Sequence, residues 1–154
     1  MTSGNGREEH EVLAAYLTQH RLKRSAQREV ILDAFLRAGQ HVSVEDLLRV
    51  VKRRHPEVGR TTIYRTLKLF KDAGLASELL LGGEARFEPA LRRDHHDHFV
   101  CRVCGEIIEF QSPQIERIQE EIAAGLGFRI EGHRHHIFGR CRRCVSKKAE
   151  LRAR

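Results

Sequence analysis

Residues 59–89 read GRTTIYRTLKLFKDAGLASELLLGGEARFEP, and this stretch decides the fold of the N-terminal half. Apolar residues recur at helical spacing over residues 60–73 and Gly74 follows, which predicts an amphipathic helix with a glycine stop. Residues 79–81 and 85–88 flank two consecutive glycines, which predicts a β-hairpin with a tight turn. Helices followed by a small hairpin are the order of a winged helix-turn-helix.

Further helices are expected upstream of this stretch. Residues 9–19 carry an apolar face, and a second helix is expected between Ser25 and Gly39. A third begins near Ser43, because Ser43 and Asp46 have the spacing of a capping box in which Asp replaces the usual Glu or Gln. The hairpin therefore follows several helices.

The outer face of the helix over residues 60–73 suits nucleic acid. It offers Thr61, Tyr64, Arg65 and Lys68, whose hydroxyls and cations can contact phosphates and base edges. The surrounding region is strongly basic, with Glu57 the only acid among these cations: Arg49, Lys52, Arg53, Arg54, Arg60, Arg65 and Lys68. A solvated helix face is the alternative for such a run, but the helix occupies the position that enters the major groove in helix-turn-helix modules.

The length and composition of the chain limit the classes of protein to which it can belong. Its 154 residues allow one ordinary domain or two small ones, which excludes a large multidomain enzyme. A net charge of +7 suits a polyanionic partner. No apolar run approaches the roughly 18 residues of a membrane span, and the start lacks the apolar core of a signal peptide. We therefore expect a cytoplasmic protein with no membrane partner.

Two CxxC pairs contain every cysteine of the chain: Cys101, Cys104, Cys141 and Cys144. In a chain without a signal peptide, this pattern favours a structural zinc site with four thiolate ligands over disulfides. A redox pair is the alternative. The pairs are separated by 36 residues, more than the about 15–20 of a compact zinc ribbon, so a structural unit must lie between them.

The second half is expected to form a small β-β-α-β unit. The pattern predicts strands at residues 95–101 and 106–110, a helix after Ser112-Pro113, and a long strand over residues 128–138. Such a unit is too small to bury much core alone, so zinc and dimerisation are expected to support it.

The predicted fold class is therefore α+β, with an N-terminal winged helix-turn-helix domain and a small C-terminal α/β dimerisation domain. The expected boundaries are residues 1–88 for the winged-helix DNA-binding domain, 89–94 for a hinge, and 95–154 for the metal-binding dimerisation domain with its basic tail.

The segment Asp94-His95-His96-Asp97-His98 is the densest set of metal-ligand side chains in the chain. Side chains alternate between the two faces of a strand, so His95 and Asp97 are expected on one face and His96 and His98 on the other. One short segment can thus contribute to two metal sites. A histidine-rich polar loop is the alternative interpretation.

Partners for both faces can be sought elsewhere in the sequence. His41, Glu88 and Glu109 offer nitrogen and oxygen donors that suit Fe(II), Mn(II), Co(II) or Zn(II) and not Cu(I). The other face can recruit Glu116 and His133, with His135 and His136 nearby. Histidines without such a pattern are expected on the surface: His10, His20 and His55.

The chain resembles the ferric uptake regulator (Fur) family of metal-dependent bacterial repressors. The resemblance rests on HVSVEDL (41–47), GRTTIYRTL (59–67), HHDHFVCRVCGEIIEF (95–110) and the second CxxC pair. It implies a homodimer with N-terminal winged helices and a C-terminal dimerisation domain. It also implies metal-dependent binding to AT-rich palindromic operators in double-stranded DNA, with no small-molecule substrate.

The resemblance also implies roles for individual residues. The regulatory metal site would comprise His41, Glu88, His96, His98 and Glu109. A second site would comprise His95, Asp97, Glu116 and His133. The four cysteines would hold structural zinc, Tyr64 and Arg65 would contact the major groove, and Lys23 the minor groove.

Family members differ in the signal they sense. Peroxide sensors of this family typically carry Asp at the position of Glu88, and zinc sensors often place a cysteine in the regulatory site. This chain has Glu88 and no cysteine outside the two CxxC pairs. Both features favour an Fe(II)-dependent repressor of iron-uptake genes, with peroxide, zinc or manganese sensing as alternatives. A mononuclear metal enzyme or a metal buffer is possible from the donor types alone, but neither explains the basic helix.

Overall fold

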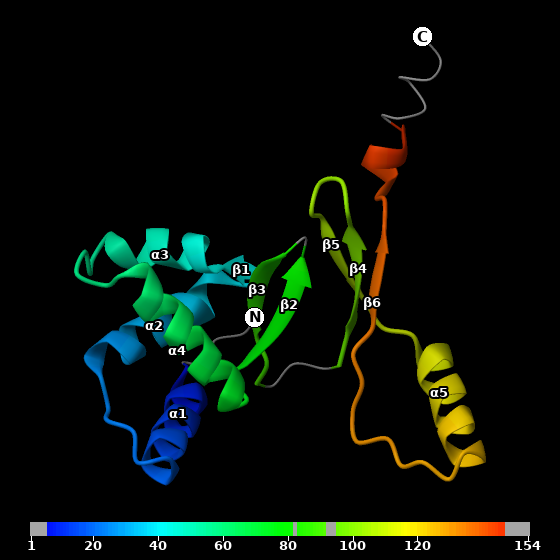
Figure 1. The fold of residues 1–154 in the computed structure, drawn as a ribbon, viewed down its shortest axis with the longest axis horizontal. Helices are drawn as coiled ribbons and strands as arrows, with labels where there is room; N and C mark the ends of the chain where they lie inside the picture. Colours follow the sequence, from blue (N-terminus) through cyan, green and yellow to red (C-terminus); the bar gives the residue numbers. More distant parts are fainter. Residues whose placement is uncertain (1–5, 82, 92–94, 147–154) are drawn as a thin grey trace. The chain divides into compact units, whose positions relative to one another are not determined.

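The computed structural model describes residues 6–81, 83–91 and 95–146 (Figure 1). These residues form two compact units, one on each side of residues 92–94. Part of the expected hinge and most of the basic tail therefore lie outside the described residues. In the described part of the chain, no helix has both the length and the apolar character needed to cross a bilayer.

Helices make up most of the first unit. They are α1 (Arg7–Gln19), α2 (Ala26–Ala38), α3 (Val44–Lys52) and α4 (Arg60–Asp72), as the hydrophobic spacing predicted. Their apolar faces meet in one core with a strand residue, Phe87. The largest fully buried side chains include Leu13, Ile31, Phe35, Leu47, Ile63, Leu67, Phe70 and Phe87.

A small antiparallel sheet completes the first unit. Its strands are β1 (Val42–Ser43), β2 (Ala76–Leu81) and β3 (Glu84–Pro89), in the order β1-β3-β2. Leu81 pairs with Glu84, so two residues join β2 to β3, as the glycine pair predicted. The strand β1 was not predicted, because two residues are too few to carry a strand pattern. The helices and hairpin have the order of the predicted winged helix.

The helix starts follow the capping rules only in part. Ser43 accepts a hydrogen bond from the Asp46 amide, and the Asp46 carboxylate accepts from the Ser43 amide, so the predicted capping box is present. Hydrogen bonds from Ser43 hold the pKa of Asp46 below its usual value. Ser112 caps the helix of the second unit by accepting a hydrogen bond from the Ile115 amide, without a capping box, whereas the Ser25 side chain forms no cap hydrogen bond at the start of α2.

The second unit has the predicted β-β-α-β order. It comprises β4 (Asp97–Cys101), β5 (Ile107–Phe110), α5 (Pro113–Gly125) and β6 (His136–Gly139). The sheet order is β5-β4-β6, with β5 antiparallel and β6 parallel to β4. The prediction of a long strand over residues 128–138 is wrong. Only His136–Gly139 forms a strand, because β6 pairs with the short β4, from His98 to Cys101.

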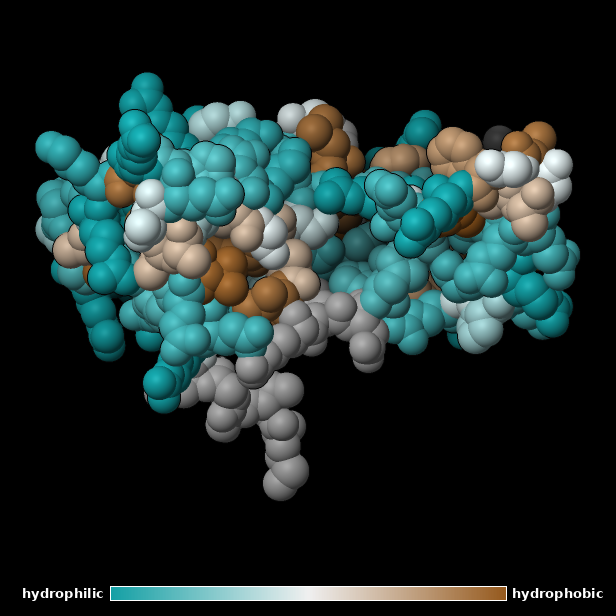
Figure 2. Space-filling view, turned by 90° about the horizontal axis from the view of Figure 1, so that it is seen from below, coloured by the Kyte–Doolittle hydropathy of each residue, from teal (hydrophilic) through white to brown (hydrophobic). Residues whose placement is uncertain are grey.

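The second unit leaves much of its apolar surface exposed. Its buried hydrophobic residues are Val100, Cys101, Ala123 and Cys144, a small set beside the core of the first unit. Figure 2 shows hydrophobic surface at the α5 end of this unit. The exposed large apolar side chains are Phe99, Val103, Ile108, Ile118, Ile122, Leu126, Phe128, Ile137, Phe138 and Val145. An apolar surface of this extent is typical of an interface.

Candidate metal centres and DNA-facing helix

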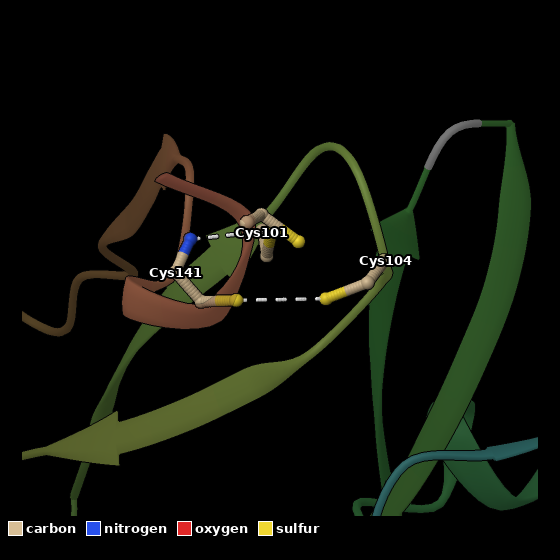
Figure 3. Close-up of side chains that lie close together, drawn as sticks. Cys101, Cys104 and Cys141 are labelled. Carbon is tan, nitrogen blue, oxygen red and sulfur yellow. Dashed lines mark hydrogen bonds between the residues drawn. The ribbon is translucent and has the colours of Figure 1, made fainter. Parts of the chain in front are cut away.

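The four cysteines converge in the second unit, around the end of β4 and the short helical turn after β6. Figure 3 shows three of them, Cys101, Cys104 and Cys141. Their sulfur atoms all lie within 4.8 Å of one another, and Cys104 Sγ lies 3.7 Å from Cys141 Sγ. Zinc–sulfur bonds of about 2.3 Å in a tetrahedron place sulfur atoms about 3.8 Å apart. The cluster therefore fits a tetrahedral Zn(II) ion.

The groups around the sulfur atoms shift the thiol pKa values of the two CxxC pairs in opposite directions. The backbone amide of Cys141 donates to Cys101 Sγ and lowers the pKa of that thiol to about 6. The pKa of Cys104 is also lowered, by the Glu106 amide and by the Arg143 guanidinium. The Glu106 side chain raises the pKa of Cys141 to about 12. A divalent cation among the sulfurs would outweigh that carboxylate, because coordinated thiols are deprotonated.

A second donor cluster lies between β4, the first turn of α5 and the segment before β6. The donor atoms of His95, Asp97, Glu116 and His133 lie within 4.8 Å of one another. His133 Nε2 lies 3.2 Å from Glu116 Oε1 and His95 Nε2 lies 3.3 Å from Asp97 Oδ1. The structure thus brings together the four residues that were expected from the sequence to form this cluster.

The fit of this cluster to a metal rests on its buried atoms. Asp97 is 1% exposed, and its Oδ2 and the Nε2 of His133 form no hydrogen bond among the described residues. Buried polar atoms without hydrogen bonds are costly, so they call for a ligand that accepts lone pairs. The His135 amide donates to Asp97 Oδ1, which orients the carboxylate. A divalent cation satisfies these requirements.

His41 and Glu88 lie together in the first unit. Val42 of β1 pairs with Phe87 of β3. Because the two strands are antiparallel, His41, which precedes Val42, lies close to Glu88, which follows Phe87. His41 Nδ1 lies 3.7 Å from Glu88 Oε2, and the Glu88 side chain is buried. His41 also has φ 58°, a left-handed conformation that a histidine adopts at some cost and that occurs often at functional sites.

In the second unit, His96, His98 and Glu109 form a separate donor set. His98 pairs with Glu109 across β4 and β5, and His96 Nε2 lies 3.7 Å from Glu109 Oε1. The rings of His96 and His98 are 4.9 Å apart. His98 lies on the face of β4 opposite to Asp97, which is the alternation expected from the sequence.

The helix α4 divides into a buried and an outer face. Ile63, Leu67 and Phe70 are buried, whereas Tyr64 is 42% exposed. The other predicted DNA-contacting residues on this helix are Arg60, Thr61 and Arg65, which are exposed, and Lys68, which is half-buried. Lys23 is exposed in the segment before α2. The exposed groups are those that can reach a phosphate or a base edge.

The sequence did not predict the carboxylates that pair with the cations of this face. Lys68 and Lys71 both donate to Glu78 on β2, and Arg60 donates to Glu45 on α3. The partners are 7–15 residues apart in the sequence, so no helical or strand periodicity relates them. Only the packing of the strand and α3 against α4 brings them together.

One expectation about the histidines is wrong. His10 is not an unpartnered surface residue, because its ring lies between Glu29 and Asp33 of α2, with Nε2 2.8 Å from Asp33 Oδ1. Burial alone would lower the pKa of His10, but hydrogen bonds to Asp33 and Glu29 outweigh it and raise that pKa above 6.5.

Known proteins support a single family. A model of the ferric uptake regulator family matches residues 19–138. The ferric uptake regulation protein of Campylobacter jejuni is 37% identical over 138 residues, which cover 88% of each chain. Its namesake from Neisseria meningitidis is 41% identical over 135 residues, or 86% of this chain and 93% of the relative.

Solved structures agree with the sequence matches. The ferric uptake regulator of Helicobacter pylori has a TM-score of 0.82 at 29% identity and covers 90% of this chain and 93% of its own. The Pseudomonas aeruginosa ferric uptake regulator with manganese has a TM-score of 0.72 at 34% identity, with 85% and 98% covered. The predicted fold class is confirmed, and the chain belongs to the ferric uptake regulator family.

Proposed function

We propose that this protein is an Fe(II)-dependent repressor that binds AT-rich palindromic operators of iron-uptake genes. The observation that carries the proposal is the division of donors along β4. Asp97 belongs to one donor cluster, and His98 on the opposite face belongs to another. A metal-responsive DNA-binding protein needs such donor sets together with an outward helix such as α4.

Each donor set has a role in the proposal. Cys101, Cys104, Cys141 and Cys144 would hold structural Zn(II), and His95, Asp97, Glu116 and His133 a second metal. His41 and Glu88 from the first unit would join His96, His98 and Glu109 from the second as the regulatory site. A bound divalent cation supplies there the positive charge that favours one arrangement of these donors. The Helicobacter pylori relative has three functional metal binding sites.

The choice of Fe(II) rests on the donors and the relatives. The regulatory donors are nitrogen and oxygen atoms without sulfur, which suit Fe(II), Mn(II) or Zn(II). Relatives at 37–41% identity are ferric uptake regulation proteins. Because Zn(II) exceeds Fe(II) in intrinsic affinity for most such sites, selectivity for iron must come partly from the availability of the metals in the cell. Manganese, zinc and peroxide sensing are the competing versions of this function.

The DNA interface in this proposal is the outer face of α4 with the segment before α2. Tyr64 and Arg65 would read the major groove and Lys23 the minor groove, while Arg60 and Thr61 would position the helix on the phosphates and Lys68 would lie beside them. Palindromic operators require two copies of the helix related by a two-fold axis. The exposed apolar side chains of the second unit are the surface proposed to form that homodimer.

A metal enzyme is the alternative from a different class. Two histidines and a carboxylate can form the facial triad of an iron oxygenase. The discriminating experiment measures the metal-dependent affinity of wild-type protein and of the Tyr64→Ala variant for an AT-rich palindromic duplex. The proposal expects metal to tighten wild-type binding and the variant to bind weakly with or without metal. Equal affinities of both proteins would contradict it.

A further inference from the structure

Glu78 on β2 holds two lysines of the helix α4. Its carboxylate accepts from Lys68 Nζ at 2.7 and 2.8 Å, so both oxygens contact one ammonium group. Lys71 Nζ donates to the same carboxylate at 2.6 Å. A single carboxylate from the hairpin thus neutralises part of the charge of the helix that would face DNA.

The position of Glu78 makes this contact stronger than other ion pairs on the same surface. The Glu78 side chain is 9% exposed, whereas the Glu45 side chain that binds Arg60 is 51% exposed. Exposed ion pairs are weakened by solvent and salt, and partly buried pairs are weakened less. In agreement, the Glu78 hydrogen bonds raise the pKa of Lys68 and, against the effect of burial, lower that of Glu78.

Lys68 lies where a phosphate contact would form. Its ammonium is 5.7 Å from the centre of the Tyr64 ring, and both side chains line a cavity of about 580 Å³ between α3, α4 and the hairpin. Arg60, Glu78 and Glu84 line the same cavity. Because Lys68 is only half-buried, releasing it from Glu78 would place a free cation on the outer face of α4.

We propose that Glu78 is a specificity-determining residue, which restrains Lys68 and thereby suppresses binding to DNA that lacks the operator. The inference rests on the proposed function, because it assumes that α4 faces DNA. Non-specific affinity comes almost entirely from cations that displace counterions from phosphates. A lysine that is already neutralised adds little to this affinity, whereas Tyr64 and Arg65 keep their capacity to contact bases.

The test is the salt dependence of binding to a random-sequence duplex, for wild type, Glu78→Gln and the matched control Glu84→Gln. Both substitutions remove one negative charge from the same cavity. Glu84 binds Arg86, which also contacts Asp46, so its loss frees no cation. Each freed lysine steepens the log–log salt slope by about 0.9, so the release of Lys68 alone in Glu78→Gln is expected to cost about 3.5-fold more affinity between 50 and 200 mM salt, and the release of Lys71 as well would increase that loss. Glu84→Gln is expected to retain the wild-type slope. Equal slopes for the two variants would overturn the proposal.

A second comparison does not depend on the folding of Glu78→Gln. In the wild-type background, Lys68→Ala is expected to leave the salt slope on random DNA unchanged, because that ammonium is already paired. A slope flattened by about 0.9 would show that Lys68 already contacts phosphate and would overturn the proposal. In the Glu78→Gln background, Lys68→Ala is expected to reverse the steepening that Lys68 causes.

Failure of the proposed function is distinguishable in the same assay. If metal-loaded wild type binds operator and random duplexes equally, sequence-specific regulation is contradicted. The slopes on random DNA would still report whether Glu78 restrains Lys68.

Discussion

His98 on β4 lies directly opposite Glu109 on β5 in the antiparallel sheet of the second unit. The strand pairing fixes this relationship, so it does not need a metal to bring the two side chains together. The adjacent residue Asp97 points to the other face, toward Glu116 and His133. One strand therefore presents two preorganised donor sets, and substitutions on its two faces are expected to have different consequences.

Substitution of His96 or Asp97 tests this division. His96→Ala is expected to abolish metal-activated operator binding, because it removes a donor of the proposed regulatory site. Asp97→Ala is expected to weaken that binding less, since it affects the second site. The measurement is operator affinity with and without added metal, with metal content determined for both variants. Equal loss of metal activation would show that the two faces do not have separate roles.

The cysteine cluster is expected to be structural. Cys101→Ser should remove the bound zinc and destabilise the second unit, because the free energy of metal binding is part of the folding free energy. Each kcal/mol lost lowers the Tm of a domain of this size by about 4–8 °C. Zinc content, thermal unfolding and sedimentation measure the effect, and mostly monomeric protein is expected. A variant that stays a stable dimer without zinc would rule out this role.

Arg65 and Lys23 are expected to differ in what they recognise. Arg65→Ala should cost about 1–3 kcal/mol of operator binding and relax the preference at one position of each half-site. Lys23→Ala should weaken binding to all sequences and flatten the salt dependence. Affinities for an operator and its point variants at two salt concentrations separate the cases. If Arg65→Ala alters only the salt slope, Arg65 contacts phosphate and does not read bases.

The contact between α1 and α2 is expected to depend on pH through His10. Because the pKa of His10 is raised above 6.5 in the folded chain, its contribution to stability is complete below pH 6.5. That contribution is lost as the pH rises through the folded-state pKa. His10→Gln should therefore lower Tm most at acidic pH and little at alkaline pH. His20→Gln, which alters a ring stacked on Tyr16, is the control. A constant difference across pH would contradict the assignment.

Local rules predicted most of the elements. The capping box of Ser43 and Asp46 and the glycine pair after Leu81 act over a few residues, so their structural outcome could be read directly from the sequence. The strand over residues 128–138 failed because strand length depends on the partner, and β4 offers only a few residues for pairing with β6. The strand β1 depends entirely on pairing with β3.

The candidate site shows the same limit. Alternation along a strand predicted which face Asp97 and His98 would occupy. No local rule relates Glu78 to Lys68 or His10 to Asp33, because those contacts arise when separate elements pack. Ion pairs between separate elements therefore could not be predicted from the sequence. The metal donors could be predicted, because they were recognised by residue type and spacing.

The central claim is that metal binding controls DNA binding. The direct measurement is anaerobic titration of zinc-loaded protein with Fe(II), followed by operator affinity at fixed salt, with a random duplex of equal length as control. Allosteric coupling typically changes affinity about 5–150-fold, so Fe(II) is predicted to tighten operator binding at least about fivefold and to leave random DNA almost unchanged. An operator affinity that is independent of Fe(II), Mn(II) and added Zn(II) would contradict the account.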